Sequence, residues 1–264
     1  MSQYGFIEDV FPIPFLNLSC RSQDIYLSSY IIEQLVFKYP QKIEHLKYLI
    51  FDLYDYNGFN IDISMTTGYL YYMSCGGVYC EHNFNQNIHY KHRLSEELFM
   101  NQYMIREDKK GRRNFQKLFI EHYLELPENK NDNRFGHIAK EEPIMSKKFV
   151  GTNVRKQFEA TIKENIKILE NNLKILKCYK KDLEIIFTLI PRYITMEEIA
   201  IPFMKEWKNA FEGSMRYFQN LYGIRFYDFK SCTEISGNCR FYSDVNHLNT
   251  IGGRCLTTLM MKNL

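Results

Sequence analysis

The chain has 264 residues, of which 45% are hydrophobic and 25% charged, with a net charge of +3. This length suits one large domain or two small ones, and the composition is ordinary for a soluble globular protein. The small net charge argues against a nucleic-acid partner, and no apolar run approaches the roughly 18 residues of a membrane span.

The seven cysteines show no CxxC pair and no zinc-ligand spacing. Reduced thiols and the lack of a signal peptide favour a cytoplasmic protein, and no motif indicates a metal or other cofactor.

Four short apolar segments predict buried strands, because each is rich in β-branched or aromatic residues and is bounded by polar turns. They are residues 15–18, 48–51, 185–190 and 224–227. Helical patterns separate them, over residues 25–36 (closed by Pro40), 158–176 and 203–221, and a last helix begins near Asn249, a good N-cap. This alternation predicts a parallel sheet with helices on both faces, whose chemistry lies outside the carboxyl ends of the strands.

A Tyr-, Asn- and His-rich segment at about residues 66–145 interrupts this alternation. We interpret the chain as one α/β domain, residues 1–264, with this segment inserted as a cap or as one wall of a cleft. Its His82, His89 and His92 have no acidic partner pattern, which favours surface histidines over a metal site.

Asp244 and His247 form an Asp-x-x-His motif just before the last predicted helix, and the motif is predicted to follow the last strand directly. A carboxylate at this spacing can fix the tautomer of the imidazole, which can then activate a hydroxyl nucleophile. The alternative is a surface histidine beside a capping aspartate.

The run 241–253, which contains this motif, resembles the last block of the SGNH/GDSL hydrolase superfamily. The start of the chain is similar to a bacterial branch associated with surface polysaccharide biosynthesis, in which a Gly-x-Ser-Tyr turn precedes an Asn-Leu-x-x-x-Ser-Gln-Asp segment, here residues 17–24. The resemblance implies a three-layer α/β/α fold with a parallel flavodoxin-like sheet and Ser2 as the nucleophile. The strand that should present Ser2 would lie upstream of Met1, or the protein lacks it.

The resemblance also implies two contributors to an oxyanion hole. One is a backbone N–H near Ser22, although Ser22 and Asp24 can equally be helix caps. The other is the residue at position 54, where the family has asparagine and this chain has Tyr54, a longer hydrogen-bond donor. Arg192 follows the third predicted strand and could clamp a carboxylate or phosphate of the substrate, or be an ordinary surface arginine.

The resemblance therefore implies an esterase or O-acyltransferase that acts on an acylated carbohydrate or another small ester through Ser2, His247 and Asp244. The alternative is a catalytically degenerate SGNH-like domain that binds a glycan or a protein partner through its Tyr-rich insertion.

Overall fold

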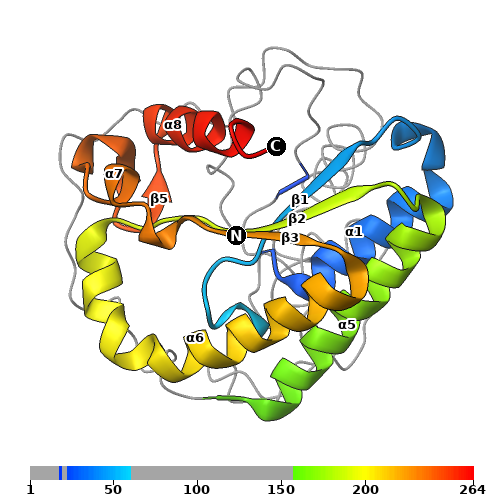
Figure 1. Ribbon diagram of the computed structural model, residues 1–264, viewed down its shortest axis with the longest axis horizontal. Helices are drawn as coiled ribbons and strands as arrows, with labels where there is room; N and C mark the ends of the chain where they lie inside the picture. Colours follow the sequence, from blue (N-terminus) through cyan, green and yellow to red (C-terminus); the bar gives the residue numbers. More distant parts are fainter. Residues whose placement is uncertain (1–17, 20–22, 61–156) are drawn as a thin grey trace, which may run out of the picture.

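The centre of the fold is a sheet of three parallel strands, seen in a computed structural model that describes residues 18–19, 23–60 and 157–264 (Figure 1). The strands are β1 (Tyr48–Asp52), β2 (Glu184–Leu189) and β3 (Arg225–Asp228). β2 lies between the other two and is buried from Ile185 to Leu189. The prediction of an α/β protein with a parallel sheet is confirmed for the described part of the chain.

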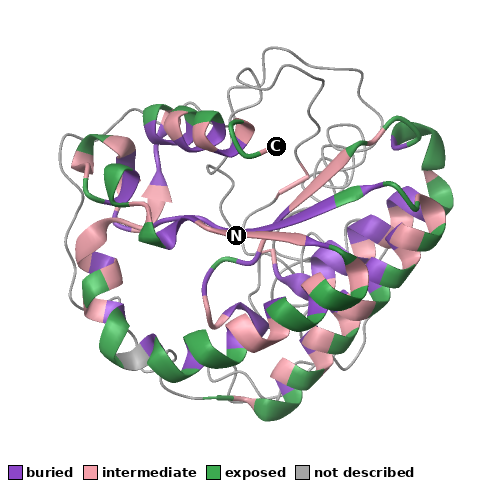
Figure 2. Ribbon diagram, in the orientation of Figure 1, coloured by how far each residue is buried: buried purple, intermediate pink, exposed green. Residues whose placement is uncertain are grey.

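Helices lie on both faces of this sheet. α1 (Ile25–Lys38), α5 (Glu159–Tyr179) and α6 (Ile194–Tyr222) cover one face, and α7 (Thr233–Ser236) and α8 (Thr250–Met261) lie over the other (Figure 1). Successive side chains of a strand point to opposite faces, so β2 supplies both cores. Ile185, Phe187 and Leu189 pack with α1, α5 and α6, whereas Ile186 packs with Leu256 of α8, and Figure 2 shows β2 buried between these two layers.

Three of the four predicted strands are present, and their ends differ from the prediction by one residue. Their apolar, β-branched and aromatic composition explains this agreement. The remaining predicted strand is the first one in the chain, residues 15–18, and its residues 15–17 lie outside the described residues. The whole predicted insertion at about 66–145 lies outside them as well. Leu18, which is described, belongs to no helix or strand.

α6 is longer than predicted. The apolar pattern predicts a helix over 203–221, but α6 begins earlier and continues through Pro202. Proline removes a backbone hydrogen bond and commonly ends or kinks a helix. Here Met196, Ala200 and Met204 are all buried at four-residue spacing, so the apolar face runs unbroken across the proline. Burial of that face outweighs the local helix-breaking tendency.

Contrary to the prediction, the Asp-x-x-His motif does not follow the last parallel strand, β3, directly. Residues 229–241 intervene and form two 3-10 turns, Phe229–Ser231 and Cys239–Phe241, with α7 between them. The motif itself spans a short antiparallel hairpin of β4 (Tyr242–Asp244) and β5 (His247–Leu248), which leads into α8 as predicted.

Candidate active site

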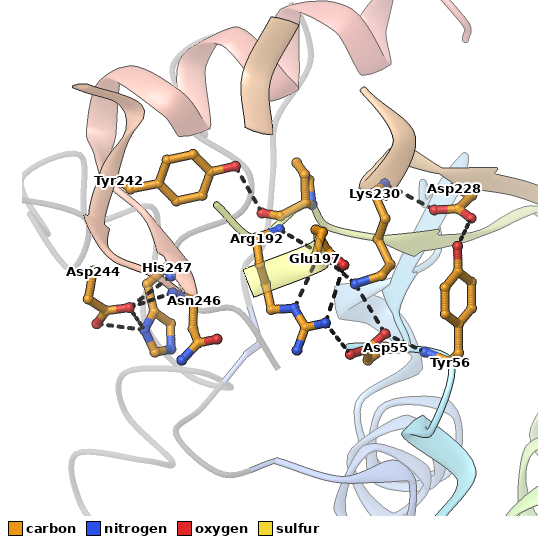
Figure 3. Close-up of polar contacts among 11 residues, drawn as sticks. Asp55, Tyr56, Arg192, Glu197, Asp228, Lys230, Tyr242, Asp244, Asn246 and His247 are labelled. Atoms are coloured by element: carbon orange, nitrogen blue, oxygen red, sulfur yellow. Dashed lines mark hydrogen bonds and ion pairs between the residues drawn. The ribbon is translucent and has the colours of Figure 1, made fainter. Parts of the chain in front are cut away.

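Asp244 and His247 face each other across the turn between β4 and β5 (Figure 3). Nδ1 of His247 lies 2.8 Å from Oδ1 and 2.9 Å from Oδ2 of Asp244. The same Oδ1 accepts hydrogen bonds from the backbone N–H groups of Asn246, at 2.8 Å, and of His247, at 3.0 Å. Because the turn's own backbone holds the carboxylate, the carboxylate can hold the imidazole in one orientation. The structure thus brings together the two residues that the motif singles out.

The electrostatics of the pair suit a proton acceptor. Partial burial raises the pKa of Asp244, but the hydrogen bonds from the His247 ring and from the N–H groups of Asn246 and His247 outweigh burial and lower it below its ordinary value. An ionised carboxylate at Nδ1 favours the neutral imidazole tautomer that carries its proton there, which leaves Nε2 as the basic nitrogen. Both side chains are 43% exposed, so a molecule from solution can reach them.

The turn is attached to the carboxyl end of β2. The backbone N–H of Tyr193 donates to the carbonyl of Val245 at 3.0 Å, and the hydroxyl of Tyr242 donates to the carbonyl of Pro191 at 3.3 Å. The rings of Tyr193 and Tyr242 also meet edge to face, with their centroids 5.6 Å apart. These contacts hold the Asp-x-x-His motif at the edge of the sheet where parallel α/β folds place their ligands.

α8 holds the turn from the other side. The side-chain oxygen of Asn249 accepts hydrogen bonds from the backbone N–H groups of Ile251 and Gly252, so Asn249 caps α8 as predicted. Its side-chain NH₂ group donates to the backbone carbonyl of Arg240 and so also fixes the preceding loop. Gly252 brings the helix close to that loop, because a Cβ at this position would lie 2.2 Å from the carbonyl oxygen of Phe241. A residue with a side chain would force the helix and the turn apart.

A second polar group lies at the same edge of the sheet. It consists of Asp55, Arg192, Glu197 and Lys230, and we call it the charge cluster (Figure 3). Nη2 of Arg192 lies 2.8 Å from Oδ2 of Asp55, and its Nε lies 3.2 Å from Oε1 of Glu197. Nζ of Lys230 lies 3.1 Å from Oδ1 of Asp55 and 2.6 Å from Oε1 of Glu197. Two cations and two carboxylates therefore alternate in a closed ring.

The charge cluster joins the ends of all three strands. Asp55 follows β1, Arg192 follows β2 and Lys230 follows β3, while Glu197 lies in the first turn of α6. Of these four residues, sequence reasoning singled out Arg192 alone. A signal was available: each strand is followed within a few residues by an acidic or basic side chain, and buried charges require partners.

The pKa values of the cluster show why its charges persist. Burial raises the pKa of Glu197, but Lys230 and Arg192 outweigh burial and lower it. Burial lowers the pKa of Arg192, but the carboxylates of Asp55 and Glu197 outweigh burial and raise it. Both groups are therefore charged at neutral pH, and each is stabilised by its neighbours in the ring.

Tyr56 borders the charge cluster. Its hydroxyl donates to Oδ2 of Asp228 at 2.5 Å, and burial together with that carboxylate raises the pKa of the phenol. Nζ of Lys230 lies 5.5 Å from the centre of its ring, and Nζ of Lys208 lies 5.4 Å from it. One ring thus contacts a buried cation of the cluster and a more exposed cation outside it.

Tyr54 lies next to Asp55 and has an unusual backbone conformation. Its φ is 69°, in the left-handed region, where a Cβ atom is disfavoured. Burial raises the pKa of its hydroxyl, against the opposing effect of the Arg192 guanidinium. The phenol is therefore a protonated hydrogen-bond donor within electrostatic reach of Arg192.

Arg192, the predicted substrate clamp, lies in the charge cluster. Its Nε and Nη2 face protein carboxylates, and its side chain is 12% exposed. Its suggested contact with substrate stays a prediction. Ser2 and Ser22 lie outside the described residues. The nucleophile and the backbone donor near Ser22 therefore stay predictions as well.

Comparison of the chain with protein-family models, with curated proteins and with solved structures finds no match. In the part of the chain that the structure describes, no helix is long and apolar enough to cross a membrane. The same residues contain no group of three or more His, Cys, Asp or Glu side chains arranged to hold a metal ion.

Proposed function

We propose that the protein is an SGNH/GDSL-like serine esterase or O-acyltransferase that acts on an acylated carbohydrate or another small ester. The observation that carries this proposal is the contact of both Asp244 carboxylate oxygens with Nδ1 of His247, on a turn attached to the carboxyl end of β2. A carboxylate and an imidazole in this relation are the orienting group and the base of a serine triad.

In the proposed reaction Ser2 is the nucleophile. Nε2 of His247 takes the proton from Oγ of Ser2 as Oγ attacks the acyl carbonyl. The tetrahedral intermediate then collapses, and the imidazolium returns the proton to the departing alcohol. Water or an acceptor hydroxyl attacks the acyl-enzyme in the same way and regenerates Ser2. The ionised Asp244 stabilises the imidazolium in both halves of the cycle.

The order of the described strands supports the SGNH-like, flavodoxin-like part of the proposal. A flavodoxin-like sheet has the strand order 2-1-3-4-5, in which the last three strands are spatial neighbours in chain order. β1, β2 and β3 have that order, with the Asp-x-x-His motif after the last of them. On this assignment the first two strands of the fold would lie next to β1 on its free side in the described sheet, and neither of them is among the described strands.

Oxyanion stabilisation is assigned to Tyr54 and to a backbone N–H near Ser22. Tyr54 follows β1, where the family has an asparagine side chain, and its protonated hydroxyl can donate a hydrogen bond. The longer reach of a tyrosine changes the geometry of this donor, and complete loss of one oxyanion donor can slow such a reaction by about 10²-fold or more. We therefore expect slow turnover of simple esters compared with an enzyme that retains the asparagine.

The proposal is tested with a fluorophosphonate probe, which labels activated serines covalently, followed by peptide mapping. Labelling should fall on Ser2 and should be abolished in Ser2→Ala and in His247→Ala. Ser214→Ala is the matched control, since its hydroxyl bonds the backbone carbonyl of Ala210 within α6, at 3.2 Å. Hydrolysis of p-nitrophenyl acetate by the same variants gives the rate.

Two results would count against the enzyme. Equal labelling of wild type and His247→Ala would remove His247 as the base. Absence of labelling, together with binding of an acylated oligosaccharide that survives in Ser2→Ala, would favour the non-catalytic SGNH-like domain instead.

A further inference from the structure

Residues 191–193, which follow β2, are held on one side by the charge cluster. The backbone N–H of Arg192 donates to Oε1 of Glu197 at 3.1 Å, and Nε of Arg192 donates to the same oxygen at 3.2 Å. Lys230 contacts that oxygen at 2.6 Å as well. A single carboxylate oxygen therefore fixes both the main chain and the side chain of Arg192.

The same three residues hold the Asp-x-x-His turn on their other side. The backbone carbonyl of Pro191 accepts a hydrogen bond from the hydroxyl of Tyr242, at the start of β4. The backbone N–H of Tyr193 donates a hydrogen bond to the carbonyl of Val245, inside the motif. Val245 is 3% exposed and Tyr242 is fully buried, so these contacts lie in the packed interior, whereas the pair they support is half exposed. Figure 3 shows Arg192 between the turn and the rest of the charge cluster.

We propose that Glu197 is a positioning residue for the Asp244–His247 pair and acts through residues 191–193. The inference rests on the proposed function only in that the pair is the base of the reaction. Its physical basis is the steep dependence of proton transfer on geometry, because a displacement of about 1 Å at a catalytic group can cost about 10²-fold in rate. The connection consists of five hydrogen bonds, three from Arg192 to Glu197 and two between residues 191–193 and the turn.

The main test is Glu197→Gln, with Glu198→Gln as the matched control. The glutamine keeps the size of the side chain but has one oxygen and one NH₂ group. The two carboxylate oxygens of Glu197 face donors, since Oε1 accepts from Arg192 and Lys230 and Oε2 accepts from Nη2 of Arg192 at 3.3 Å. Either orientation of the amide therefore places a donor against a cation. Glu198 is the next residue of α6 and is exposed, so its replacement leaves the cluster intact.

The readout is the tautomer of His247, from the ring ¹⁵N shifts of histidine-labelled protein, with His247→Gln used to assign the signal. We expect the wild type and Glu198→Gln to have the proton on Nδ1, and Glu197→Gln to show a mixture of tautomers well below its melting temperature. In p-nitrophenyl acetate hydrolysis, kcat should fall about tenfold or more in Glu197→Gln while KM changes less than about twofold.

Tyr242→Phe provides a milder test if Glu197→Gln does not fold. It removes the hydroxyl that bonds Pro191 and keeps the buried ring, and Tyr227→Phe is its control because the Tyr227 hydroxyl bonds the carbonyl of Asn263, away from the turn. A changed tautomer of His247 in Tyr242→Phe, with the wild-type tautomer kept in Tyr227→Phe, would support the proposal.

Two outcomes would overturn the positioning role of Glu197. One is a wild-type protein in which the His247 ring does not carry its proton on Nδ1. The other is a Glu197→Gln variant that melts at a lower temperature but keeps the wild-type tautomer and kcat. The tautomer is measured without substrate, so a wild type that the fluorophosphonate probe does not label but that shows the expected shifts would leave the positioning role standing and count only against the proposed function.

Discussion

The charge cluster and the Asp244–His247 pair are built from similar contacts, carboxylates against nitrogen, in opposite settings. In the cluster the four side chains are between 1% and 15% exposed, and each carboxylate faces two cations. In the pair both side chains are 43% exposed, and the carboxylate faces one imidazole and two backbone N–H groups. A closed, buried ring satisfies its own charges and belongs to the architecture, whereas the half-exposed pair is the part that the proposed function places next to the ligand.

Asp244→Asn should have the largest effect of all, and this effect should be on activity. The asparagine oxygen can still accept hydrogen bonds from the backbone N–H groups of the turn. The neutral amide no longer selects the tautomer of His247 that carries its proton on Nδ1. We expect kcat for ester hydrolysis to fall by about 10²–10⁴-fold, measured beside Ser214→Ala as a control that should keep its rate. A wild-type rate in Asp244→Asn would mean that the carboxylate has no part in the reaction.

Lys230→Met should have the largest effect on stability. Removal of one partner from a buried ion-pair group commonly costs about 3–5 kcal/mol, because the remaining charges lose their compensation. Lys208→Met is the matched control, since Lys208 lies over the same Tyr56 ring but is 47% exposed, and it should change stability by less than about 1 kcal/mol. Urea denaturation measures both. Equal losses in the two variants would show that the cluster is no more important than a surface contact.

Gly252→Ala should have an intermediate effect on stability, through the side of the turn that faces α8. The added Cβ would meet the carbonyl oxygen of Phe241 at 2.2 Å, so the helix must shift, at a cost of about 1–3 kcal/mol. Gly213→Ala is the control, because nothing lies within 4 Å of its Cβ position inside α6, and alanine should stabilise that helix by up to about 1 kcal/mol. Thermal unfolding of the two variants should therefore move in opposite directions.

The pH dependence contributed by Asp244 should be the smallest effect. Its pKa in the folded protein is lowered, so its contribution to stability is complete above the pKa of the unfolded chain and is lost as pH falls through the folded value. The stability difference between wild type and Asp244→Asn should therefore shrink from about pH 6 to about pH 3. Glu197, whose pKa is also lowered, is present in both proteins and cancels from the comparison. A difference that does not vary with pH would rule out a charge-based contact with His247.

The sequence predicts these two regions unequally. The Asp244–His247 contact joins residues three positions apart, so a local pattern suffices to find it, and the capping of α8 by Asn249 is local in the same way. The charge cluster joins residues from the ends of three strands that are far apart in the chain. A charged residue follows each strand, but no local pattern reveals which of these residues pair, because the pairing depends on strand order and on the burial of the sheet edge. The course of α6 through Pro202 was missed for a related reason, since tertiary burial decides it.

The left-handed backbone of Tyr54 has an evolutionary consequence. Among the residues that the structure describes, Tyr54 is the only one other than glycine with a positive φ, and asparagine is one of the few residues that tolerate this conformation well. On the proposed SGNH-like assignment, the main chain at this position already has a conformation that the asparagine of that family would tolerate. Tyrosine and asparagine codons differ by a single nucleotide, so a lineage could exchange the two donors in one step without rebuilding the loop.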